Sequence, residues 1–283
     1  FTDPERVHPI DHPGAHFDVP GIHLSEPSPQ RTPVIFQAGA SPRGQDFAAK
    51  HGEAIFINGL APELTRRVTD SIRSKAEAIG RPRDSVKILT LATVVVAETD
   101  EEAQAKYAGF REYISIEGAL ALYGGWSGVD MSSLDPDLPL KYVDTDAARS
   151  ALSIFTTADP TREWTPRDIA EYVGIGGIGA VIVGSPTTVA DELERWIEVG
   201  GIDGFNLAYV ITPGTFEDIV ELLIPELRRR GRVWNDYEGA TLRERLSGST
   251  VVPEWHPAHQ YRGAFADSRS AADGNASLIT AAH

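Results

Sequence analysis

Short apolar runs alternate along the chain with segments in which apolar residues recur every three or four positions. The apolar runs predict strands at 33–38, 54–57, 86–97 and 204–210. The helical patterns follow them at about 41–50, 61–79, from 99 onward, and at about 215–230. Four strand–helix units of this kind predict an α/β fold with a parallel sheet covered by helices. We therefore expect the four strands to be parallel neighbours in one sheet.

The ends of these helices carry recognisable signals. Thr99 and Glu102 form a capping-box pattern at the start of the third helix, and Gly80 ends the second. Pro225 lies inside the fourth helical pattern, where its ring and missing N–H should kink or interrupt the helix.

An irregular excursion at about 110–200 separates the third and fourth units. Two further helices are predicted in it, at about 166–172 and 185–199. Its aromatic residues allow two interpretations, a lid over a substrate pocket or a satellite core beneath a long loop. These aromatic residues are Tyr123, Trp126, Tyr142 and Trp164. Four strand–helix units would make half of an eight-stranded barrel, and in such barrels the sites lie at the C-terminal ends of the strands. We therefore expect residues 110–165 to cover these strand ends.

The first strand leads directly into the turn Gly-Ala-Ser-Pro-Arg-Gly. Ser41 is a favourable N-cap, and Pro42 occupies the first helical position. Gly39 and Gly44 allow a ligand to approach the backbone. The free N–H groups and the dipole of a helix N-terminus favour an anion such as phosphate. An ordinary capped turn is the alternative, and we expect the Ser41 hydroxyl and the following amides to face an open concavity.

A second Gly-Ser-Pro turn occurs at 184–186, with Ser185 as N-cap. The interpretation favoured there is an ordinary capped helix. The glycines of the stretch 176–184 precede its apolar run, whereas a dinucleotide-binding turn has them after a strand.

Composition and charge narrow the classes of partner. The net charge of −15 disfavours nucleic acid and anionic membranes. Without cysteine there is no disulfide or thiolate chemistry, and no apolar run approaches the length of a membrane span. The polar, Pro-rich start is unlike a signal peptide, so we expect a cytoplasmic protein.

Four early histidines are candidate metal ligands. His8, His12, His16 and His23 have helical spacing, but the prolines between them exclude a regular helix. We expect no metal, and a hairpin-like loop over residues 12–22 instead.

The two ends of the chain also suggest expectations. The sequence begins at Phe1 without a Met, and about thirty residues precede the first strand, so we expect a preceding portion to be missing. Residues 263–283 are small and polar and predict a disordered tail. Residues 1–262 are expected to form part of a single barrel domain.

Several stretches together resemble the bacterial luciferase-like superfamily. They include "PVIFQAGASPRGQDFAAKHGEAIF", "VGSPTTVADELERW" and "GIDGFNLAYVITPGTFEDIVELLIPELRRRG". Within it the chain is similar to the large components of nitrilotriacetate and dibenzothiophene-sulfone monooxygenases, over residues 1 to about 262. The resemblance implies the C-terminal half, strands five to eight, of a (β/α)8 TIM barrel.

The resemblance also implies a function. Members use FMN that a separate NAD(P)H-dependent reductase has reduced, and O2 is the co-substrate. A flavin hydroperoxide then inserts one oxygen into a small organic substrate such as a sulfone or an alkane. A homo-oligomer is expected as well. The alternatives are a deazaflavin-dependent oxidoreductase of the same fold, a flavin-binding protein without turnover, or an inert fragment.

The family's site transfers to few residues. Gln37, Gly39, Ser41 and Gly44 match its phosphate-binding turn, so the resemblance implies that Ser41 binds the FMN phosphate. Ala40 replaces a second Ser of many members. Gly179 stands where many members carry a His, so no acid–base role can be transferred there. The catalytic residues are unknown and are expected in the absent N-terminal half.

Overall fold

The computed structural model describes residues 3–140, 155 and 162–262. The chain divides into two compact units. The larger unit comprises residues 35–238, and the smaller unit comprises residues 1–34 together with 239–283.

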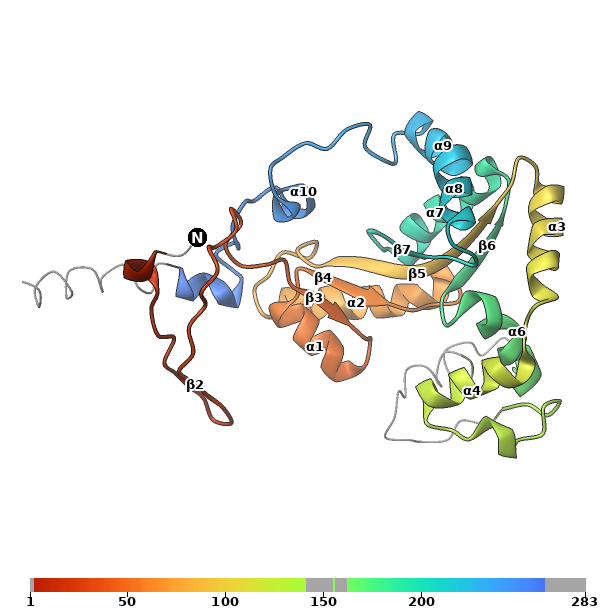
Figure 1. Cartoon of the computed structure of the whole chain (residues 1–283), viewed down its shortest axis with the longest axis horizontal. Helices are drawn as coiled ribbons and strands as arrows, with labels where there is room; N and C mark the ends of the chain where they lie inside the picture. The colour runs from red at the N-terminus through yellow and green to blue at the C-terminus, as the bar shows by residue number, and fades with distance from the viewer. Residues whose placement is uncertain (1–2, 141–154, 156–161, 263–283) are drawn as a thin grey trace, which may run out of the picture. The chain divides into compact units, whose positions relative to one another are not determined.

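A parallel sheet forms the centre of the larger unit (Figure 1). Its strands β3 (Phe36–Ala38), β4 (Ala54–Ile57), β5 (Lys87–Val96) and β7 (Gly204–Ala208) lie in that order. All three pairings between them are parallel. The prediction of four adjacent parallel strands is therefore confirmed.

The sheet also contains a fifth strand, β6 (Ala180–Gly184). This strand lies within the excursion, where the sequence pattern predicts none. The first half of β5 pairs with β4 and the second half, Ala92–Val96, pairs with β6. Because β7 pairs with residues 89–93 of β5, β4 and β6 share the opposite edge of β5. The unusual length of β5 creates this second pairing site beyond the end of β4.

Helices pack against one face of the sheet. They include α1 (Pro42–His51), α2 (Pro62–Ala78) and α7 (Pro186–Gly200), while α3 (Asp100–Arg111) follows β5 and contacts β6. Their core includes Ile72 of α2 and Trp196 of α7, which join Ile88 and Val94 of β5. The capping box of Thr99 and Glu102 is formed as predicted.

The last helix of this unit is interrupted as the sequence predicted. It consists of α8 (Gly214–Asp218), the π-helical turn η3 (Ile219–Leu223) and α9 (Ile224–Arg229). Pro225 lacks an N–H, and its ring would clash with the carbonyl four residues earlier, so the turn before it widens.

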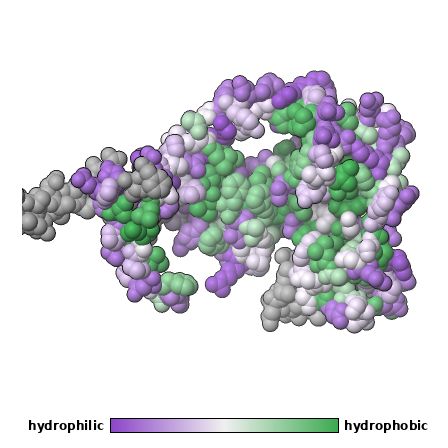
Figure 2. All heavy atoms as spheres, in the orientation of Figure 1, coloured by the Kyte–Doolittle hydropathy of each residue, from purple (hydrophilic) through white to green (hydrophobic). Residues whose placement is uncertain are grey.

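The opposite face of the sheet keeps apolar surface. Gln37, Ile55 and Ile88 share the helix-covered side by register, whereas Phe56 and Leu89 share the other side. Phe36 stacks on Phe56 with a ring separation of 5.3 Å and remains 38% exposed. In the space-filling view, apolar residues are visible over this part of the sheet (Figure 2).

The excursion forms a second apolar core. Its elements are α4 (Ile116–Ser127), η2 (Met131–Ser133) and α6 (Pro166–Gly176). Phe155 makes edge-to-face contacts with Tyr123 at 5.5 Å and Trp164 at 4.8 Å, and all three are buried. Trp126 packs against the same cluster. The satellite-core interpretation therefore holds for these residues, while Tyr142 lies outside the described residues.

One contact locates the excursion relative to the strands. Leu60, three residues beyond the end of β4, packs against the second core. The described part of the excursion thus contacts the loop that follows β4, and the wider expectation that residues 110–165 cover the C-terminal ends of the strands stays a prediction.

The smaller unit has little regular structure. Its elements are η1 (Pro4–Arg6), β1 (His12–Pro13), β2 (Asp18–Val19), α10 (Leu242–Ser247) and η4 (Pro257–Tyr261). β1 and β2 form the hairpin expected there. Arg243 is fully buried and donates hydrogen bonds to the carbonyls of Gln30, Thr32 and Pro33, which joins the two sequence segments. Residues 263–283 lie outside the described residues.

Two kinds of feature are absent from the part of the chain that the structure describes. None of the helices in that part of the chain is long and apolar enough to cross a membrane. Among the same residues, no group of three or more histidine, aspartate or glutamate side chains is placed to hold a metal ion.

Candidate functional site

The turn between β3 and α1 has the capped geometry that the sequence predicts. Ser41 is the N-cap in an extended conformation, and its Oγ accepts the N–H of Gly44 at 3.1 Å. Pro42 occupies the first helical position. Because Pro42 has no N–H, three N–H groups at this helix end lack a helical acceptor, and a side chain satisfies one of them.

The two glycines of the turn are required for different reasons. Gly39 has a φ of +107°, which side-chain-bearing residues rarely adopt, and open space surrounds the position of a Cβ there. At Gly44 a Cβ would lie 2.7 Å from the Gly39 carbonyl oxygen. Gly44 is thus needed to close the turn, whereas Gly39 leaves the backbone accessible from outside.

Gln37 acts on the turn through the backbone. Its Nε2 donates to the Ala38 carbonyl at 2.9 Å, and its register places it on the helix-covered side of the sheet with Ile55. The side chain therefore fixes the Ala38–Gly39 peptide just before the turn.

Several donors at the turn have no acceptor among the described residues. The N–H groups of Ser41 and Arg43 make no hydrogen bond with any described residue, and the Ser41 hydroxyl keeps its proton available. Arg43 is exposed and forms no ion pair with another described residue, and the first turn of α1 contains no acidic residue. These groups suit a phosphate, because all of them donate and none is negatively charged.

The second Gly-Ser-Pro turn is occupied by a carboxylate of the chain itself. Asp100, the first residue of α3, accepts the Ser185 N–H at 2.7 Å and the Thr188 hydroxyl at 3.0 Å. These bonds, the first of them above all, hold the pKa of Asp100 below its ordinary value. The ordinary-cap interpretation of Ser185 is therefore confirmed, and the two turns differ in whether an internal anion is present.

Gly179 is closely packed against β5. A Cβ at this position would lie 2.6 Å from Leu91 Cγ and 2.7 Å from its carbonyl oxygen, and the Gly179 carbonyl accepts the Tyr172 hydroxyl at 2.7 Å. A histidine does not fit here without a shift of the backbone. No imidazole can therefore be assigned an acid–base role at this position.

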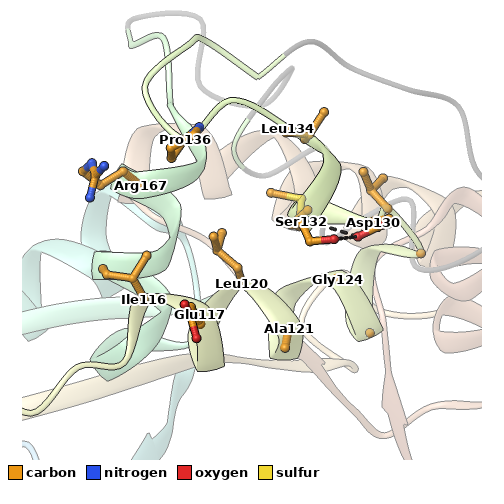
Figure 3. A pocket seen from close by; sticks show the side chains of 14 residues that line it. Ile116, Glu117, Leu120, Ala121, Gly124, Asp130, Ser132, Leu134, Pro136 and Arg167 are labelled. Atoms are coloured by element: carbon orange, nitrogen blue, oxygen red, sulfur yellow. Dashed lines mark hydrogen bonds between the residues drawn. The ribbon is translucent and has the colours of Figure 1, made fainter.

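A pocket of about 1020 Å³ lies in the excursion, between α4, η2 and the start of α6 (Figure 3). Its apolar lining includes Leu120, Met131 and Leu134, and Ser132 is hydrogen-bonded to Asp130 at its edge. Arg167, also in the lining, is bonded to Asp137. The pocket contains none of the residues predicted to bind cofactor. The sequence does not predict its lining, because Gly124 and Gly125 are poor helix formers and no helix is expected at α4.

Several curated relatives of this chain are named as monooxygenases. The dimethyl-sulfide monooxygenase of Hyphomicrobium sulfonivorans is 50% identical over 96% of this chain and 57% of its own length. The long-chain alkane monooxygenase of Geobacillus thermodenitrificans is 41% identical over 93% of this chain and 56% of its own length. The chain thus spans slightly more than half the length of these curated relatives. A dibenzothiophene-sulfone monooxygenase and a nitrilotriacetate monooxygenase component also match, which confirms the branch that the sequence indicated.

Two solved structures share the fold of this chain over more than nine-tenths of its length. The crystal structure of DmoA from Hyphomicrobium sulfonivorans superposes with a TM-score of 0.82 and covers 94% of this chain and 56% of that one. A riboflavin lyase solved with modified FMN and riboflavin is 37% identical, with a TM-score of 0.80, over 92% of this chain and 57% of that one. The family model described as luciferase-like monooxygenase matches residues 5–203. On this evidence the chain belongs to the luciferase-like monooxygenase family.

Proposed function

We propose that the full-length protein is the large component of a two-component monooxygenase that uses reduced FMN. The observation that carries the proposal is the β3–α1 turn, whose donors at Ser41 and Arg43 have no acceptor in the described chain. In a chain of this family, a phosphate-bearing flavin is the anion that these donors fit best. The comparable turn at Ser185 is excluded because Asp100 already occupies it.

The four predicted residues would share the work of holding the flavin phosphate. Ser41 donates its hydroxyl and N–H, and Gly39 leaves the approach open. Gly44 and Gln37 keep the turn in the shape that exposes these donors. The bound reduced flavin would supply the electrons that activate O2.

Strands β3, β4, β5 and β7 are proposed to be the fifth to eighth strands of a (β/α)8 barrel. Two observations support this assignment. The relatives are matched over only 56–57% of their length, and the sheet face that carries Phe36 and Phe56 keeps apolar surface. An inner barrel face lined by the other four strands would bury such residues.

The excursion is proposed to exclude water from the reacting flavin. Its contact with Leu60, in the loop after β4, supports the proposal, because the face at which strands end carries the site in barrels of this type. A rigid aromatic core of Tyr123, Phe155 and Trp164 would keep this cover in shape.

The substrate is proposed to be a small organic sulfide, a sulfone or an alkane, with O2 as co-substrate. Two relatives above 40% identity act, by their names, on dimethyl sulfide and on long-chain alkanes. An NAD(P)H-dependent flavin reductase would be the partner, and we propose a cytoplasmic homo-oligomer that binds neither nucleic acid nor membrane.

Isotope labelling of the full-length protein tests the proposal. Reductase, NADH, FMN and ¹⁸O2 are supplied with dimethyl sulfide, a sulfone or an alkane in turn, and products are read by mass spectrometry. We expect one substrate to yield a product that carries a single ¹⁸O. Hydride transfer to a deazaflavin without O2 uptake would contradict the proposal in favour of the oxidoreductase alternative. Absence of both reactions, with flavin still bound, would indicate a binding protein without turnover.

A further inference from the structure

Gln45 connects the candidate phosphate turn to the neighbouring helix. Its Nε2 donates to the carbonyl of Ala40 at 2.7 Å, and its Oε1 accepts the hydroxyl of Ser71, on α2, at 2.7 Å. Both side chains are partly buried between α1 and α2. A chain of two hydrogen bonds therefore runs from α2 to the centre of the turn.

The chemistry of these groups fixes the orientation of the Gln45 amide. A carbonyl can only accept, so the NH2 end of Gln45 must face Ala40. The hydroxyl of Ser71 can donate, and it does so to the remaining amide oxygen. The reversed amide would oppose two oxygens at Ala40 and lose that bond.

The fixed carbonyl determines where the next N–H points. In a trans peptide the C=O and the following N–H lie on opposite sides of the bond. Because the Ala40 carbonyl is held toward Gln45, the Ser41 N–H is directed away from Gln45. This N–H is one of the donors without an acceptor in the described chain.

The second Gly-Ser-Pro turn shows that a capped helix does not need this glutamine. Gln45 follows Ser41 by four positions, and the corresponding residue after Ser185 is Val189, which is fully buried in the main core. At that turn the Ser185 N–H is held by Asp100 instead. The side-chain amide at position 45 therefore occurs at the turn that has no carboxylate bound to it among the described residues.

We infer that Gln45, held by Ser71, is a positioning residue for the flavin phosphate. It orients the Ala40–Ser41 peptide so that the Ser41 N–H is presented to the phosphate without reorganisation on binding. This inference rests on the proposed function of the turn. It predicts an effect on flavins that carry a phosphate and none on riboflavin, which lacks one.

The test compares two ligands in the full-length protein. Dissociation constants of reduced FMN and reduced riboflavin are measured for the wild type, Gln45→Met, Ser71→Ala and Ser41→Asp. Methionine keeps the size of Gln45 and removes its donor. We expect Gln45→Met to weaken FMN binding roughly fivefold to tenfold, from one misplaced charge-assisted hydrogen bond, and to leave riboflavin binding unchanged. Ser71→Ala should weaken FMN binding by about two- to threefold in the same selective way.

Two results would overturn the inference. Equal weakening of FMN and riboflavin in Gln45→Met would show a general structural role, and unchanged FMN binding in both Gln45→Met and Ser71→Ala would show no role at all. Ser41→Asp separates these failures from a failure of the proposed function. If Ser41→Asp binds FMN as the wild type does, the turn is not the phosphate site, and the inference about Gln45 is wrong with it.

Discussion

The carboxylate of Asp100 accepts the backbone N–H of Ser185 at 2.7 Å. The two residues are 85 positions apart, and the bond joins the first turns of α3 and α7. A charged acceptor of the chain thus stands where a bound anion would stand at a free helix N-terminus. The turn at Ser41 has the same Ser-Pro cap but no such acceptor among the described residues, which is why we assign the phosphate to it.

Replacement of Asp100 should lower stability without affecting flavin binding. Asp100→Ala leaves the donors of Ser185 and Thr188 without their acceptor, so the melting temperature should fall. Asp84→Ala is the matched control, because Asp84 is exposed and makes no hydrogen bond with another described residue. An equal effect of the two substitutions would contradict the assigned role.

The same carboxylate predicts a dependence on pH. The pKa of Asp100 is lowered in the fold, first by the bond from Ser185. A group of this kind contributes stability above its unfolded pKa and loses the contribution as pH falls through the folded value. The difference in melting temperature between wild type and Asp100→Ala should therefore be full at pH 7 and shrink below about pH 4. A difference that stays constant down to pH 3 would count against a charged cap.

Arg81 should be essential for the C-terminal end of α1. It is 3% exposed and donates to the carbonyls of Ala49 at 2.7 Å and Gly52 at 2.8 Å. Burial lowers its pKa to about 10, so it remains charged at neutral pH. Arg81→Met should reduce the free energy of unfolding by about 2–4 kcal/mol, because buried carbonyls lose their donors. Urea unfolding of the full-length protein measures this loss.

Arg83 provides the control for that measurement. It lies two positions away, has a 44% exposed side chain and, among the described residues, pairs only with the carboxylates of Asp70 and Glu77. Arg83→Met should cost about 1 kcal/mol or less, as surface ion pairs do. Similar losses for Arg81→Met and Arg83→Met would show that the bonds to α1 contribute little.

Tyr172 should secure the excursion to the strand that follows it. Its hydroxyl donates to the Gly179 carbonyl at 2.7 Å, directly before β6. Tyr172→Phe keeps the ring in the aromatic cluster and should cost about 0.5–1.5 kcal/mol of unfolding free energy. Tyr113→Phe, at a residue that is 88% exposed, should change nothing measurable. Hydrogen exchange of the β6 amides should rise in the first variant and stay unchanged in the second.

Short stretches of sequence were sufficient to predict the strands, the helix caps and the helix interruption. The capped starts at Ser41, Thr99 and Ser185, the four parallel strands and the interruption at Pro225 could all be predicted from neighbouring residues. Helix α4 was missed because Gly124 and Gly125 are poor helix formers, and its helical structure depends on packing against α6.

The features that decide the site depend on long-range contacts. Strand β6 exists because β5 extends beyond β4, which no short window of sequence shows. The bond between Asp100 and Ser185 joins residues 85 positions apart, and Ser71 reaches Gln45 across 26 positions. The sequence therefore predicts both Ser-Pro caps. It does not show that the carboxylate of Asp100 occupies the one at Ser185.

The most direct test of the central claim compares the two turns in one experiment. Reduced FMN is titrated into the full-length protein carrying Ser41→Ala or Ser185→Ala, substitutions that remove the same hydroxyl from two capped helices. Our account predicts a dissociation constant about tenfold higher for Ser41→Ala, as expected for one lost bond to a charged acceptor, and an unchanged constant for Ser185→Ala. Ser41→Asp should bind more weakly still, because it places a like charge against the phosphate. Equal affinities in Ser41→Ala and Ser185→Ala would contradict the account and leave the β3–α1 turn as a helix cap alone.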